Sequence, residues 1–184
     1  MKTKFTKECI LSQRGCYDRS EVEQLKFINQ KSITIKTLFN HLPIKDFTWF
    51  LVRKCDLTLT EKRKFALHCA KQAIPIYEKQ YPDDKRVREC VEATYLYLDD
   101  KITIEELKVK KNAAYDAAYA AADAADAAYA ADAAYAAADA ASAAYAAYAA
   151  DAADAASAAA DAAYAAAAAY KKSIWDYVEN ELIN

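Results

Sequence analysis

The chain has 184 residues, of which 55% are hydrophobic and 28% charged, so it has enough apolar material to form a core. It contains only one glycine and three prolines. β-Sandwich folds need many tight turns, and phosphate-binding loops need repeated glycines, so the composition excludes both and predicts an all-α protein.

The net charge of −2 hides an asymmetry. Residues 1–112 carry 23 Lys and Arg against 16 Asp and Glu, whereas residues 113–170 carry eight Asp and no basic residue. The basic residues are scattered among acids, so we expect no nucleic-acid binding. No apolar leader is visible, the alanine tract is interrupted by Asp, and the five cysteines form no CxxC pair. We therefore expect a cytoplasmic protein with reduced thiols that neither spans nor binds a membrane.

Short helices with capping signals are predicted along the first hundred residues. Capping boxes stand at Ser20–Glu23, Thr58–Glu61 and Thr103–Glu106. Thr34 precedes an apolar pattern that predicts a helix over 35–42, with a strand at Ser32–Ile35 as the alternative.

Two longer apolar stripes follow. Phe65, Cys69, Ala73 and Tyr77 recur at every fourth position, and a second stripe runs from Val87 to Leu98. This spacing predicts two helices, separated by the helix-stopping sequence Tyr-Pro-Asp-Asp at 81–84.

Residues 113–170 form a tract of 40 Ala, eight Tyr, eight Asp and two Ser. Alanine is the best helix former, so helix is predicted throughout. The larger residues recur about every 3.2 positions, less than the 3.6 of a helix turn, so their stripe winds around a straight helix. Either the helix breaks into segments with different faces, or several partners surround it; repeat expansion without a selected period is a further reading.

With no breaker inside the tract, we predict one continuous helix roughly 120 Å long, and an antiparallel hairpin is the alternative. We also expect the tract to pack on something, with Tyr as the large partner between helices and Asp as a solubilising charge. The predicted organisation is a helical globular domain over 1–102 and an alanine-rich repeat helix with an apolar tail over 103–184.

The tail carries a compact apolar stripe of Ile174, Trp175, Val178 and Leu182. Trp175 is too large and apolar to be left in water where a surface is available. We expect the tail either to dock on the basic half of the chain or to form an oligomer contact.

No constellation of residues predicts catalysis or a metal site. His68, Cys69 and Cys90 could supply zinc ligands, but adjacent residues on a helix diverge by about 100° and the usual ligand pairs are missing. We therefore expect no enzyme activity, no metal and no cofactor.

One stretch resembles a family of bacterial and phage proteins labelled putative immunity proteins. Its pattern runs C-A-x-x-x-L-P-x-x-E, P-D-D-x-R-P-R and E-A, and leads into an alanine-rich helix. The matching residues are Cys69, Ala70, Pro75, Glu78, Pro82, Asp83, Asp84, Arg86, Arg88, Glu92 and Ala93. Val87 replaces the second proline of the pattern, and Asp100 stands where a glycine is common.

The resemblance covers about residues 60–135 and implies an all-α, non-enzymatic, cytosolic protein that neutralises a toxin or host factor by binding it. The alternative is an assembly protein that forms homo-oligomers through the alanine-rich helix or the Trp175 tail. Partner-binding candidates are Asp83, Asp84, Arg86, Arg88 and Glu92. Their structural reading is that Asp83 or Asp84 caps a helix and that the arginines pair with Glu78 or Glu92.

Overall fold

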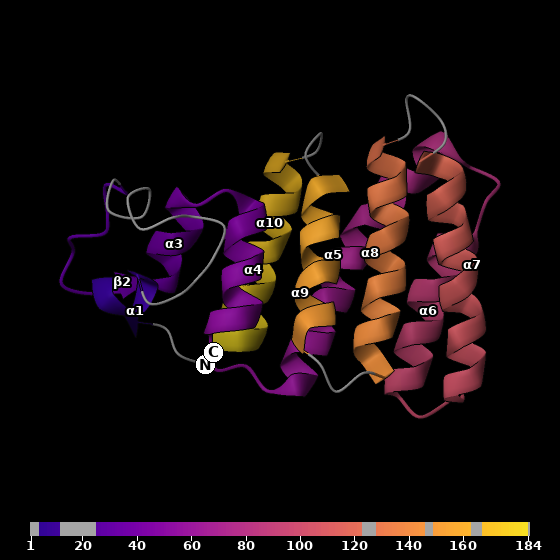
Figure 1. Cartoon of the computed structure of the whole chain (residues 1–184), viewed down its shortest axis with the longest axis horizontal. Coiled ribbons are helices and arrows are strands. Elements are labelled where there is room, and N and C mark those ends of the chain that lie inside the picture. Colours follow the sequence, from indigo (N-terminus) through magenta and orange to yellow (C-terminus); the bar gives the residue numbers. More distant parts are fainter. Residues whose placement is uncertain (1–3, 12–24, 123–127, 146–148, 163–166, 184) are drawn as a thin grey trace.

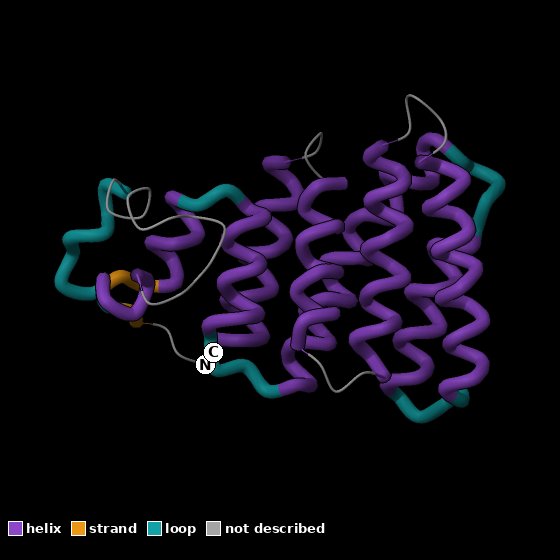
Figure 2. Tube along the Cα trace, in the orientation of Figure 1, coloured by secondary structure: helices purple, strands orange, loops and turns teal. Residues whose placement is uncertain are grey.

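The computed structural model describes residues 4–11, 25–122, 128–145, 149–162 and 167–183. Two short strands, β1 (Lys4–Phe5) and β2 (Ile33–Thr34), lie at the N-terminal end. The helices are α1 (Lys7–Leu11), α3 (Ile35–His41), α4 (Ile44–Lys54), α5 (Leu59–Gln80), α6 (Arg86–Leu98), α7 (Ile104–Ala122), α8 (Ala128–Tyr145), α9 (Ala149–Ala162), α10 (Ala167–Tyr177) and the π-helix η2 (Val178–Ile183). The prediction of an all-α protein is confirmed, since helices dominate the trace (Figure 2).

The longer helices stack in two layers (Figure 1). The front layer contains α4, α9, α8 and α7 in that order, and α10, α5 and α6 lie behind it. Helix α8 packs on α7 and α9 within its layer and on α5 and α6 in the other layer. Tyr119 of α7 pairs with Tyr135 of α8. Tyr115, which comes earlier in α7, pairs with Asp139, which comes later in α8, so the two helices run antiparallel.

The prediction of one continuous helix through the alanine tract is wrong. The described part of the tract is divided among the C-terminal part of α7, α8, α9 and the start of α10, which lie side by side. The reason lies in the spacing of the larger residues, which leaves no single alanine face along the full length. Helices α7, α8 and α9 instead each keep an alanine face and bury it against their neighbours.

Helix α8 is divided cleanly between alanine and larger residues. Among its side chains that the structure describes, every buried one is alanine, and the partly exposed ones are Asp132, Tyr135, Asp139 and Ser142. Four helices surround α8, and alanine lets their backbones approach closely. The expectation that the tract packs on something is thereby confirmed.

Polar contacts between described residues also tie the layers together, among them the 2.9 Å ion pair of Lys110 in α7 with Glu89 in α6. The Arg63 guanidinium of α5 donates from Nε to the carbonyl of Ala143 at 2.9 Å, close to the C-terminal end of α8. The last carbonyls of a helix have no donor within the helix, so the charged guanidinium of Arg63 satisfies an acceptor that would otherwise lack a partner. The Cys90 thiol of α6 lies 3.5 Å from the carbonyl of Ala137.

Two predicted helix starts have the expected capping geometry. The Thr58 side chain accepts from the Glu61 backbone N–H while the Glu61 carboxylate accepts from the Thr58 N–H. Thr103 and Glu106 repeat this arrangement at the start of α7. The capping box at Ser20–Glu23 lies outside the described residues.

The N-terminal residues add a small unit beside α4. Thr34 caps α3 as predicted, and the alternative reading is also correct in part, because Ile33 and Thr34 form β2. The partner strand that the sequence did not reveal is β1, with Phe5 opposite Ile33. Buried side chains from both halves of the chain form one core cluster, and the division at residue 102 stays a prediction.

The apolar tail docks on this N-terminal part. The Trp175 ring lies 4.8 Å from the Phe39 ring, and the Lys171 ammonium lies 5.0 Å from Phe39. Ile174, Val178 and Leu182 are buried. Of the two roles predicted for the tail, docking within the chain is the one observed.

Candidate functional site

The motif residues of the sequence analysis lie at the connection between α5 and α6. Asp84, Arg86 and Arg88 contact neighbouring motif residues, whereas Asp83 and Glu92 are exposed. The structure therefore brings three of the five candidates into one polar cluster, and the cluster bonds mainly to itself.

Asp84 is the centre of this cluster. Its carboxylate accepts from the Tyr77 hydroxyl at 2.6 Å, from the Arg86 backbone N–H at 3.0 Å and from the Arg86 guanidinium at 2.6 Å. The bond to the Arg86 N–H satisfies a donor at the start of α6, so Asp84 caps this helix. Hydrogen bonding by Arg86 lowers the pKa of Asp84 to about 2.

A second ion pair lies beside the first. The Arg88 guanidinium donates to both oxygens of Glu78, at 2.7 and 2.6 Å, and Lys85 lies 3.8 Å from the same carboxylate. The bidentate bond from Arg88 lowers the pKa of Glu78. Since Glu78 belongs to α5 and Arg88 to α6, this pair fastens the two helices together.

A groove of about 420 Å³ crosses the other end of α5 and α6. Its walls include Lys64, His68, Tyr95, Asp99, Tyr177 and Glu181. The His68 ring stacks 4.5 Å from Tyr177 and its Nε2 lies 3.1 Å from the Ser173 hydroxyl. Burial lowers the pKa of His68 and raises the pKa of Tyr177 to about 12, so at neutral pH both groups are uncharged.

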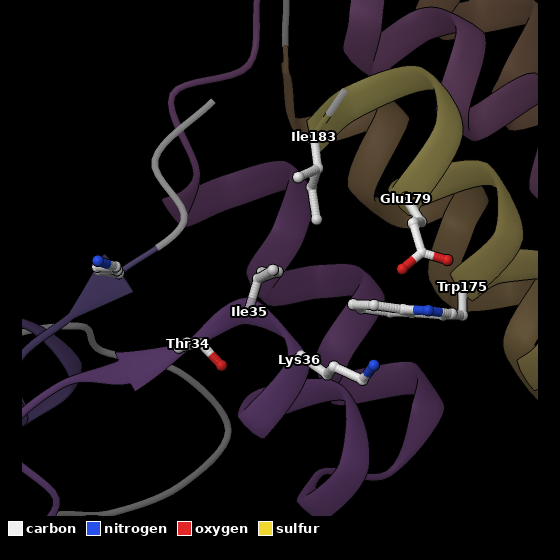
Figure 3. Close-up of a pocket in the computed structure, with 7 residues that line it drawn as sticks. Thr34, Ile35, Lys36, Trp175, Glu179 and Ile183 are labelled. Atoms are coloured by element: carbon white, nitrogen blue, oxygen red, sulfur yellow. The ribbon is translucent and has the colours of Figure 1, made fainter.

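A pocket of about 260 Å³ lies where the tail meets the N-terminal unit. Figure 3 shows the flat Trp175 ring between Lys36 and Glu179, with Ile35 and Ile183 across the opening. The Lys36 ammonium lies 5.6 Å from the ring centroid. Because the Lys36 ammonium already lies over the Trp175 ring, we assign this pocket to the contact between the tail and the N-terminal unit.

The outward side of the front layer carries tyrosine and aspartate. The Tyr115 and Tyr119 rings of α7 lie 6.1 and 5.9 Å from the Tyr135 ring of α8, and the Tyr115 hydroxyl donates to Asp139 at 2.6 Å. Tyrosines of the tract were expected to pack between helices. Tyr170 is buried and Tyr115 and Tyr135 pack partly against the core, as expected, whereas Tyr119 is 61% exposed.

The thiols offer no nucleophile among the described residues. Cys55, Cys69 and Cys90 are buried and form no disulfide, and burial raises the pKa of Cys69 and Cys90 to about 12. Within the described ranges, no three His, Cys, Asp or Glu side chains gather as a metal site would require. Among the described helices, none combines the length and apolar character that crossing a membrane requires.

Comparison with known proteins gives one match. The family model of the Imm-5 like putative immunity proteins matches residues 60–181, from α5 to the π-helix. No curated protein and no solved structure matches the chain. The matched range is about two thirds of the sequence and includes both helical layers except α4, so the chain belongs to the Imm-5 like putative immunity protein family.

Proposed function

We propose that this protein neutralises a protein partner by binding it, without catalysing a reaction. The observation that carries the proposal is the family match over residues 60–181. The structure is consistent with this proposal, because Asp84 and Arg86, and Glu78 and Arg88, bond to one another, and burial lowers the pKa of His68. We infer that it acts in the cytoplasm of a bacterium or phage-infected cell, where its buried thiols stay reduced.

We propose a structural role for Asp84, Arg86 and Arg88. The acceptors of Asp84 and the donors of Arg88 are used within the chain, which leaves few of them for a partner. Asp83 and Glu92 are exposed and are the members of the motif that a partner could reach.

The proposed function is tested with the products of the genes that neighbour this one in its native genome, each assayed for toxicity, and a toxic product serves as the toxin. Co-expression is expected to restore growth, and the purified proteins are expected to form a complex of fixed stoichiometry that blocks the toxin only at matching concentrations. Protection at far lower concentrations than the toxin would indicate turnover and contradict binding as the mechanism. Self-association without any toxin complex would favour the assembly protein instead.

A further inference from the structure

The outward side of α7 and α8 has a composition that helix packing does not fully explain. We define the Tyr/Asp face as Tyr115 and Tyr119 of α7 with Asp132, Tyr135 and Asp139 of α8. The described buried positions of α8 are all alanine. Tyr115 and Tyr135 pack partly against the core, whereas Tyr119 is exposed, so packing accounts for only part of the face.

Solubility accounts for the aspartates of this face but not for its tyrosines. A charged residue keeps an alanine-rich surface from aggregating, whereas an exposed aromatic ring adds apolar area to water. Tyr119 is 61% exposed, and its contact is one edge-to-face ring pair with Tyr135. Tyrosine is enriched at protein interfaces, where its ring packs and its hydroxyl finds a partner.

The face also shows which chemistry it attracts. The Lys111 ammonium lies 5.6 Å from the centroid of the Tyr115 ring, in a cation–π contact at the edge of the face. Burial and the nearby charge of Asp161 raise the pKa of Asp132, whereas Lys45 lowers it, so a neighbouring cation favours the charged form of this carboxylate.

Basic residues border the Tyr/Asp face on this side of the molecule, with Lys111 of α7 beside Tyr115 and two more on α4. Lys45 and Arg53 of α4 lie 2.6 and 4.0 Å from Asp161 and Asp154 of α9, respectively. The sequence supplies no Lys or Arg between 113 and 170. The front layer is therefore basic along α4 and acidic and aromatic along α8.

We propose that the Tyr/Asp face is the docking surface of the neutralised partner, and that the partner presents an Arg- or Lys-rich patch to it. This inference rests on the proposed function. Guanidinium groups stack on tyrosine rings and bind carboxylates in a bidentate manner, so one basic patch engages both residue types at once. Such a contact speeds association and weakens as salt rises.

The test begins with covalent capture. Tyr119 or Tyr135 is replaced by the photoreactive p-benzoylphenylalanine, and Tyr95, a 41% exposed tyrosine in the groove across α5, is replaced in the same way as a control. The probe is the adjacent toxin, illuminated with each variant in cells. We expect crosslinks from positions 119 and 135 to Lys- or Arg-rich peptides of the toxin. Crosslinks from position 95 alone, to acidic peptides, or to a second copy of this chain would overturn the proposal.

Binding of the same purified toxin gives the second arm. Tyr119→Ala and the double variant Asp132→Asn with Asp139→Asn are each expected to weaken binding at least tenfold, and the double variant is expected to lessen its salt dependence. Tyr95→Ala and the charge-matched double variant Asp56→Asn with Glu105→Gln are expected to bind as wild type does. Unchanged affinity in both face variants would overturn the proposal.

Growth rescue separates the two levels of the account. If the wild-type chain rescues and the face variants also rescue, neutralisation stands and the Tyr/Asp face is not its surface. If the wild-type chain gives neither rescue nor a complex, the proposed function fails and this inference fails with it. Circular dichroism and thermal melts of each variant confirm that a loss of binding is not a loss of folding.

Discussion

Asp84 joins two helices through a single carboxylate, which receives the Tyr77 hydroxyl from α5 and both the backbone and the guanidinium of Arg86 from α6. These donors favour the charged form and hold its pKa at about 2, against an ordinary value of 3.8. A depressed pKa in the folded state contributes stability above the unfolded pKa, and that stability is lost as the pH falls.

We therefore expect Asp84→Asn to lower the free energy of unfolding by about 2 kcal/mol at pH 7, the value to which the pKa difference corresponds. The difference in the free energy of unfolding between wild type and Asp84→Asn should disappear between about pH 4 and pH 2, where wild-type Asp84 becomes protonated. Urea unfolding at pH 7, 4 and 2.5 measures it. A gap that stays constant across this range would mean that the carboxylate's charge is not what stabilises the connection. Asp83→Asn, at the exposed neighbour, serves as the control.

Asp100 occupies a position that suits glycine. Its φ is 56°, in the left-handed region, and it follows the end of α6. The Asp100 N–H donates to Tyr97 and the Lys101 N–H to Leu96, which together form a Schellman motif. Asp100 therefore carries a side chain in a backbone conformation that favours glycine.

Asp100→Gly is expected to stabilise the protein by about 0.5–1 kcal/mol. Relief of the left-handed strain gains about 1–2 kcal/mol, and the greater freedom of glycine in the unfolded chain offsets about 0.4–1 kcal/mol of it. Differential scanning calorimetry measures the change. Asp99→Gly, at an ordinary φ of −93°, should show no gain; an equal gain at both positions would rule out the strain explanation.

At the scale of the helices, the alanines of α8 are expected to be irreplaceable. Ala141 is fully buried, and the next residue, Ser142, faces outward. Ala141→Leu inserts three extra carbons between closely packed helices and should cost about 1–3 kcal/mol or more. Ser142→Leu should change stability by no more than about 0.5 kcal/mol. Chemical unfolding of the pair checks this, and equal losses would mean that the layer packing is not as described.

Alanine packing, more than charge, is expected to hold the tract in place. Its described ion pairs with α4 are exposed, and exposed pairs contribute about 0.2–1 kcal/mol each. Amides of α8 and α9 should therefore keep nearly the same hydrogen-exchange protection at low salt and at 0.5 M salt. A large loss of protection at high salt would mean that the ion pairs between the tract and α4, and not alanine packing, are its main support.

Local signals predicted the helices well and their arrangement poorly. Thr58, Thr103 and Thr34 each mark a helix start because capping is decided by neighbouring residues. A division of the tract into segments was only an alternative to the predicted continuous helix, because no glycine or proline stands between 113 and 170 and helix propensity does not report which face finds a partner. Strand β1 was not predicted because a strand of two residues is too short to show an alternating pattern of apolar and polar residues.

The candidate site was predicted only in composition. The Tyr/Asp stripe was visible in the sequence, but whether tyrosine or alanine filled the helix interface depended on how closely the helices approach. The motif from Asp83 to Glu92 was visible as well, and its structural reading fits the contacts of Asp84 and Arg88. A fuller prediction needed the stacking of α8 against four helices, which is a long-range property.

As a whole molecule, the protein is a two-layered stack whose alanine tract supplies most of the front layer, with the N-terminal unit beside one end (Figure 1). Family membership covers the stack from α5 onward, whereas α4 and the strands lie outside the matched range. The N-terminal unit covers the side of the stack at Trp175, where Phe39 of α3 contacts the tail.

Small-angle X-ray scattering of the monomeric chain tests this architecture most directly. A compact chain of this length has a radius of gyration of about 16 Å, and the layered stack should lie within a few ångströms of that value. A continuous helix of about 80 residues would instead reach roughly 120 Å. A maximum dimension above about 100 Å, independent of protein concentration, would contradict the folded alanine layer and with it the Tyr/Asp face.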